Sequence, residues 1–161
     1  MKKIIAIAAL AAAISSGAHA SNSYDNALTG TPAADNITAH SVAFNVNSAY
    51  QPLSITDANQ TDATTLATKG DANRVIVASS FTAAANHQYK LSAVTVTGAN
   101  QSEQLTASFS SSTDKPDDPS AKNIAHTPDG GTIHILLTQN AGTAMAKGST
   151  TASYTVTDYA S

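Results

Sequence analysis

Histidine side chains are the groups in this chain best suited to metal or acid–base chemistry. After residue 20 they stand at positions 40, 87, 126 and 134. None lies two residues along a strand, or four along a helix, from another histidine or a carboxylate, so none has a metal-ligand spacing. His134 lies between Ile133 and Ile135, and strand alternation therefore directs it to the solvent side of a strand rather than into a site.

The carboxylates and possible nucleophiles also match no known metal-binding or catalytic motif. The acidic segment 114–119 lacks the regular spacing and the closing glutamate of a calcium loop. Glu103 is the only glutamate, which excludes a paired-glutamate glycosidase, and nothing supports an aspartate pair in its place. No serine lies in a Gly-x-Ser-x-Gly elbow, and the absence of cysteine excludes thiol catalysis. We therefore expect no enzymatic activity, no cofactor and no metal site.

The first twenty residues have the three parts of a secretory signal peptide. Lys2 and Lys3 precede an apolar run over residues 4–14, and residues 18–20 (Ala-His-Ala) form a small-x-small cleavage site. The apolar run is too short to span a bilayer. We expect export through the periplasm, a mature chain that begins at Ser21, and no insertion into a membrane.

The mature chain is acidic and has no disulfide to hold it. Without residues 1–20, the 161-residue chain keeps 141 residues, with six basic and eleven acidic side chains and a formal charge of −5. This balance disfavours nucleic acid as a partner, because its binding needs a basic surface. The length suits one domain. An exported chain without disulfides must be held by its core, by sheet pairing or by assembly.

Short alternating or apolar runs predict strands through most of the mature chain. They lie at residues 42–46, 53–55, 75–77, 89–96, 105–109, 133–137 and 152–156. About seven strands separated by turn residues, with no helix longer than one turn, predict an all-β fold: an immunoglobulin-like β-sandwich or a small barrel.

The segments between these runs carry four further expectations. Residues 21–35 have no period and predict a flexible N-terminal arm, and residues 81–86, with three alanines, predict one helical turn. Residues 88–97 and 103–110 predict a hairpin across the turn at 98–100. Residues 111–128 hold three of the five prolines and predict a long surface loop.

The C-terminal segment is the clearest strand. Ala152, Tyr154 and Val156 alternate with polar residues, which predicts one buried and one solvated face. Gly148 precedes this run and leaves room for a turn or a close backbone approach. Tyr159 stands third from the end of the chain.

These residues resemble those of pilin subunits of the chaperone–usher pathway, especially the cysteine-free class of colonisation-factor fimbriae. Gly148, fourteen residues from the end, and the alternation after it match the family's C-terminal strand, and Tyr159 stands one position before the usual near-terminal tyrosine. Residues 36–46 (Asn-Ile-Thr-Ala-His-Ser-Val-Ala-Phe-Asn-Val) are similar to the family's donor segment, and residues 50–56 to its first strand. Residues 141–144 (Ala-Gly-Thr-Ala) are similar to its closing region, whereas the arm over 21–35 departs from the pattern.

The resemblance implies a sandwich over residues 48–161 that lacks one strand and is completed by a donor segment, residues 36–47, of another subunit. The donor side chains that would enter the groove are Ile37, Ala39, Val42, Phe44 and Val46, with a bulge near residues 40–41 to reconcile their opposite parities. The strand that would line the groove and bind the chaperone carries Gly148, Ala152, Tyr154, Val156 and Tyr159.

The resemblance also implies the partners and the location. The partners would be a periplasmic pilus chaperone, an outer-membrane usher and identical or related subunits joined head to tail. The chain would then be a structural subunit of a cell-surface fimbria that polymerises by donor-strand exchange and supports adhesion.

The residues also fit a second class of protein, a monomeric secreted β-sandwich that binds carbohydrate or a host surface as an adhesin domain. An exposed aromatic platform would favour this class. Five tyrosines, three phenylalanines and no tryptophan leave little material for such a platform.

Overall fold

The computed structural model describes residues 21–47, 52–57, 64–65, 74–111, 121–140 and 144–160. The expected signal peptide at 1–20 and most of the segment 141–144 lie outside the described residues. The strands are β1 (Ser23–Asp25), β2 (Ala34–Val46), β3 (Pro52–Asp57), β4 (Thr64–Thr65), β5 (Arg74–Ala83), β6 (His87–Leu91), β7 (Thr95–Gly98), β8 (Leu105–Ser110), β9 (Ile124–Thr127), β10 (Gly131–Gln139) and β11 (Gly148–Ala160).

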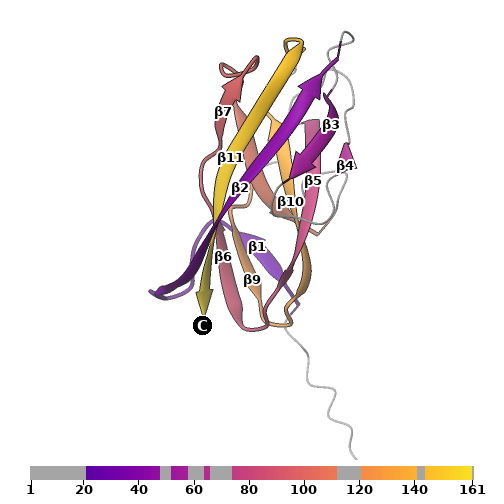
Figure 1. The fold of residues 1–161 in the computed structure, drawn as a ribbon. Coiled ribbons are helices and arrows are strands. Elements are labelled where there is room, and N and C mark those ends of the chain that lie inside the picture. Colours follow the sequence, from indigo (N-terminus) through magenta and orange to yellow (C-terminus); the bar gives the residue numbers. More distant parts are fainter. Residues whose placement is uncertain are drawn as a thin grey trace, which may run out of the picture.

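Two antiparallel sheets form the fold, which confirms the predicted all-β sandwich (Figure 1). The larger sheet has the order β1-β9-β6-β11-β2-β3, and β7 pairs with β11 beyond the end of β6. The smaller sheet has the order β4-β5-β10-β8. Among the described residues, no helix is long and apolar enough to cross a bilayer.

The core fills the space between the two sheets. Strand β10 contributes Ile133, Ile135 and Leu137, and they pack with apolar side chains of β2, β6 and β11 from the larger sheet. Leu136 points the other way and packs with Val75 and Ala78 on the opposite face of the smaller sheet. The strand predicted over residues 133–137 is therefore buried on both faces, as expected for the centre of a sheet.

The predicted helical turn at 81–86 is wrong. Strand β5 continues to Ala83, which faces Gly131 of β10, and only the next residues turn toward β6. Phe81 packs edge to face against Tyr89, with 5.2 Å between ring centroids. Burial of Ala83 and partial burial of Phe81 between the sheets outweigh the helix propensity of the short alanine run.

The predicted hairpin of residues 88–97 with 103–110 is also wrong. Strand β8 pairs with β10 in the smaller sheet, whereas β6 and β7 both pair with β11 in the larger one. The chain crosses from one sheet to the other at the turn near residues 98–104. Alternation identifies the buried face of a strand, but it does not identify the sheet to which the strand belongs.

The flexible arm and the long surface loop each contain a strand. Within the predicted arm, β1 lies at the free edge of the larger sheet, where Tyr24 faces Ala125 of β9. Strand β9 itself lies in the predicted loop 111–128, and β2 begins at Ala34, inside the predicted arm. Strands β1 and β9 were not predicted, because three or four residues are too few to show a period.

Candidate functional site

Strand β2 lies between β11 and β3 and pairs with both. Its register with β11 runs without a shift from Val46, opposite Gly148, to Asn36, opposite Asp158. On its other edge Val46 faces Pro52 at the start of β3. The segment that the resemblance assigns to a donor strand thus occupies this position within its own chain in the structure (Figure 1).

Three of the five side chains assigned to the donor point into the core of their own chain. Val42, Phe44 and Val46 are 1–3% exposed and belong to the main core cluster. Each faces a small residue on β11: Ala152 opposite Val42, Thr150 opposite Phe44 and Gly148 opposite Val46. Large side chains set against small ones interlock across the strand pair, which gives the seam its close packing.

The other two predicted donor side chains do not enter the core. Ile37 is 63% exposed and Ala39 is exposed as well. No register shift interrupts the pairing of β2 with β11 between residues 37 and 46, so the expected bulge near residues 40–41 is absent. Strict alternation places Thr38 and His40 inside instead. The apolar types of residues 37 and 39 suggested a buried face that the continuous strand cannot provide.

His40 is the inward residue that the sequence reasoning missed. Its ring is buried and stacks on Tyr154 of β11, with centroids 5.2 Å apart and planes 5° from parallel. A cavity of about 260 Å³, lined in part by Thr38, His40 and Tyr89, lies beneath this half of β2. Polar side chains are tolerated there because the core below them is not closed.

The predicted residues of the C-terminal strand take the expected sides. Ala152, Tyr154 and Val156 are buried, and Tyr159 is half-buried near the end of the strand, where it faces Ala34 and Gln88. The strand begins at Gly148, four residues before the predicted run.

Gly148 is required by both its conformation and its surroundings. Its φ is 136°, and a Cβ added there would lie 2.9 Å from the Cβ of Ala99. The close approach predicted from the sequence therefore exists, and it involves the turn between β7 and β8.

Asn100 ties this turn to the start of β11. Its side-chain amide donates to the Ala146 carbonyl at 3.0 Å and to Thr150 Oγ1 at 2.8 Å. Its Oδ1 accepts the Ala146 N–H at 2.7 Å. Because Asn100 is buried, these bonds satisfy its amide and fix the entry into β11. The sequence marked Asn100 only as a turn residue.

A polar cluster lies at the other end of β11. His87 Nδ1 is 2.6 Å from Asp158 Oδ1, and the Tyr89 hydroxyl accepts the Ala84 N–H at 2.9 Å. Burial raises the pKa of the Tyr89 phenol above its ordinary value, and the nearby Asp158 carboxylate raises it further. The pairing between His87 and Asp158 could not be predicted from the sequence, because 71 residues separate them.

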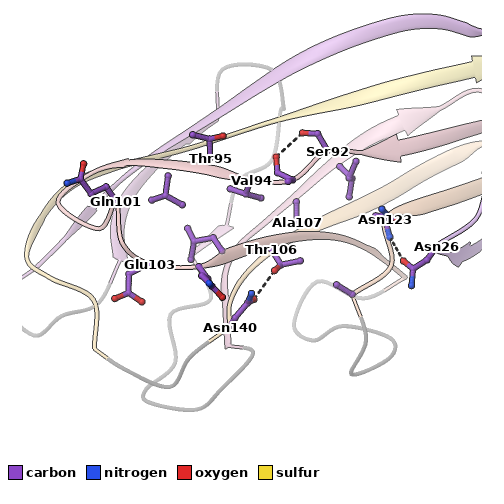
Figure 2. Close-up of a pocket in the computed structure, with 16 residues that line it drawn as sticks. Asn26, Ser92, Val94, Thr95, Gln101, Glu103, Thr106, Ala107, Asn123 and Asn140 are labelled. Atoms are coloured by element: carbon purple, nitrogen blue, oxygen red, sulfur yellow. Dashed lines mark hydrogen bonds between the residues drawn. The ribbon is translucent and has the colours of Figure 1, made fainter.

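A cavity of about 750 Å³ opens between the β6–β7 segment and β8 (Figure 2). Its rim carries amides, such as Asn26, Gln101 and Asn140, and its floor is aliphatic. Thr106 donates to Asn140 Oδ1 at 2.8 Å. Glu103 is the only ionisable side chain among the described residues that line it, and it accepts a 2.7 Å hydrogen bond from Gln139. None of these lining residues is aromatic, so the cavity offers no stacking platform for a sugar ring.

The described residues contain no group of three or more histidine, aspartate or glutamate side chains placed to hold a metal ion. Comparisons with protein-family models, with characterised proteins and with solved structures found no match. The function must therefore be argued from β2 and the space it occupies.

Proposed function

We propose that this chain is a structural subunit of a cell-surface fimbria, and that it polymerises when β2 of one subunit takes the place of β2 in the next. The observation that supports this most is the position of β2. It precedes every strand of the sandwich except the short β1, yet it lies inside the larger sheet and supplies Val42, Phe44 and Val46 to the core.

The energy associated with this strand is large. Full burial of a Val or Phe side chain contributes about 1.5–3 kcal/mol, so these three residues together contribute roughly 5–9 kcal/mol before entropic costs. A body without β2 would expose this apolar surface and the backbone edges of β11 and β3. Open edges recruit strands from other chains, and such a body therefore needs a donor.

The connection between β2 and the body allows the strand to be exchanged. Five residues, 47–51, join Val46 to Pro52. If β2 left its own body, these residues would still join it to β3, and β2 could form the same contacts in a neighbouring body. A donor on one side of the subunit and an acceptor on the other make a head-to-tail contact that does not close, and such contacts generate fibres.

The resemblance supplies the remaining parts of the proposal. A periplasmic chaperone would cover the edges of β11 and β3 during export, and an outer-membrane usher would guide the replacement of the chaperone by the next subunit's β2. The assembled fimbria would support adhesion at the cell surface.

A second candidate function is a monomeric secreted β-sandwich that binds carbohydrate or a host surface. The observation that favours it is that β2 completes the sandwich within one chain, with pairing along both of its edges. The two functions differ in one property, whether β2 pairs with β11 of its own chain or of another.

Engineered cysteines can distinguish the two cases, because the chain has none of its own. Ser41 and Ser153 face each other across β2 and β11, and both are exposed. Facing residues of antiparallel strands have Cα atoms about 4.5–5.5 Å apart, which suits a disulfide. Chains with Ser41→Cys alone and chains with Ser153→Cys alone would be produced together in the cells that naturally make the protein.

A fimbrial subunit should give covalent dimers of these two chains, and the double variant Ser41→Cys/Ser153→Cys should give a ladder of multimers. A control pair, Ile37→Cys with Ser153→Cys, is offset by four residues, about 13 Å, and should give neither. An intrachain disulfide in the double variant, with no mixed dimer, would refute the fimbrial proposal and support the monomeric module.

A further inference from the structure

We propose that residues 22–33, ahead of β2, form a second docking segment of the donor, and that this segment binds the same subunit that receives β2. This inference rests on the proposed function and extends it. The donor would then be bipartite: β2 would fill the space between β11 and β3, and the segment 22–33 would seal the opposite edge of the same sheet.

Strand β1 covers both backbone and apolar surface at that edge. It pairs antiparallel with β9 through Ser23, Tyr24 and Asp25. The Tyr24 ring stacks on Phe109 of β8, with centroids 6.3 Å apart and planes 23° from parallel. Phe109 is 1% exposed, so Tyr24 reaches across the gap between the two sheets and covers one of the largest core side chains.

Gln88 of β6 holds the middle of the segment by its backbone. Its Oε1 accepts the Thr29 N–H at 2.7 Å, and its Nε2 donates to the Thr29 carbonyl at 3.1 Å. Gln88 is 6% exposed, so a buried amide has both its donor and its acceptor satisfied by one residue of the segment. Without that residue, both groups would need other partners, which marks Gln88 as part of a site for an extended peptide.

Further contacts fix the start of the segment. Asn22 donates to the Gly130 carbonyl at 2.7 Å, and Asn26 Oδ1 accepts the Asn123 N–H at 3.0 Å. These bonds join amide side chains of the segment to backbone groups of the body. Together with Gln88, they hold the segment at points on both sides of β9.

The reach of the chain decides which subunit the segment can bind. Eight residues, 26–33, separate β1 from β2, and they span at most about 29 Å. The crossing from β2 over β11 and β6 to the far side of β9 covers four strand spacings, about 19 Å. The segment can therefore dock on the body that holds β2.

It cannot reach its own body once β2 has left. The thirteen residues of β2 extend about 43 Å, and β1 joins the end of β2 farthest from the link at 47–51 (Figure 1). A β2 inserted into a neighbour therefore carries the end of the segment that adjoins Ala34 about 40 Å away from its own body. This exceeds the span of residues 26–33, so segment and strand must share one recipient.

The test uses a second cysteine pair in the full-length chain. Ser23 and His126 face each other across β1 and β9. Chains with Ser23→Cys and chains with His126→Cys, produced together in the native cells, should give covalent dimers alongside those of the Ser41→Cys and Ser153→Cys mixture. Addition of Gln88→Ala to the His126→Cys chain should reduce the dimer linked through residues 23 and 126 about tenfold, because two hydrogen bonds are lost. It should leave the dimer linked through residues 41 and 153 unchanged. Gln101→Ala, which removes an exposed amide, should change neither dimer.

The outcomes separate the two proposals. Mixed dimers through residues 41 and 153, with none through 23 and 126, would overturn the bipartite donor and leave strand exchange standing. An intrachain disulfide between residues 23 and 126 in the double variant Ser23→Cys/His126→Cys, with dimers still formed through residues 41 and 153, would also overturn the bipartite donor. If neither mixture gives dimers, both proposals fail together.

Discussion

Replacement of Phe44 by aspartate is the most informative single change, because Phe44 belongs to the proposed donor strand and not to the proposed groove. The side chain is 2% exposed and faces Thr150 inside the core. Loss of a buried phenylalanine costs about 3–5 kcal/mol, and a carboxylate in its place must either be buried without a partner or leave the core. The lost burial and the cost of the carboxylate together are comparable with the roughly 5–15 kcal/mol that stabilises a typical domain. We expect the variant to lose its own β2 from the sheet and to form no fibres.

The matching change in the proposed groove is Val156→Asp. Val156 is buried on β11, where it faces Thr38 of β2 and Leu91 of β6. This variant keeps an intact donor but a damaged acceptor, whereas Phe44→Asp keeps an intact acceptor with a damaged donor. We expect Val156→Asp to fold poorly and to be captured poorly by a chaperone, whereas Phe44→Asp should still be captured.

The two defects should complement each other when both chains, carrying different tags, are made in the same cell. β2 of the Val156→Asp chain would complete the body of the Phe44→Asp chain, since that pairing contains no substituted contact. The measurement is co-purification of the tags together with protease resistance of the Phe44→Asp body alone. Ser41→Asp, on the exposed face of β2, is the control and should assemble like the parent chain. If the mixture is as protease-sensitive as each variant by itself, β2 is not exchanged between chains and the reasoning fails.

Three further predictions concern single residues. Gly148→Ala should lower stability by about 1–3 kcal/mol in denaturant unfolding, because φ is 136° and the added methyl meets another at 2.9 Å; Gly30→Ala, at φ 73° with open space around it, should cost less. Ile37→Ser should leave the free energy of unfolding nearly unchanged, whereas Val42→Ser should lower it by more than about 1 kcal/mol; equal effects would contradict the burial pattern of β2. The pKa of Tyr89 is raised in the folded state, so its contribution to stability should be complete below pH 10.0, the ordinary pKa. This contribution should fall as the pH rises toward the folded pKa. Tyr89→Phe should remove this alkaline loss of stability.

The parts of the fold that the sequence predicted are those with long, regular alternation. The buried faces of β10, of β11 and of residues 42–46 all follow from period-two apolar residues, and each is confirmed. The close approach expected at Gly148 is also present, since a Cβ added there would lie 2.9 Å from the Cβ of Ala99. In these segments, local pattern and tertiary burial agree.

The parts that the sequence missed depend on contacts between distant residues. Pairing of β8 with β10 rather than with β6 or β7 is a choice of sheet, which alternation does not encode. Ile37 looked like a buried residue by type, but the uninterrupted register that starts at Val46 directs it outward. Docking of residues 22–33 relies on amides such as Gln88 and on backbone groups, which leave no apolar period. Polar recognition of a backbone is therefore the feature of this site that sequence reasoning is least able to find.

The same contacts hold β2 whether the strand belongs to its own chain or to another, so contact energy alone does not choose between a closed subunit and a fibre. The five-residue link at 47–51 keeps the strand near its own groove, at an effective concentration of the order of mM. Closure within one chain should then be faster than encounter with a neighbour, unless another protein occupies the space between β11 and β3 first. We therefore expect the full chain produced by itself to form monomers, with the disulfide between Ser41→Cys and Ser153→Cys inside one chain, and production with the chaperone and usher of its native cells to shift that disulfide between chains. Equal polymerisation with and without those partners would show that β2 leaves its own groove without help. The chaperone would then have no part in directing β2 to a neighbour.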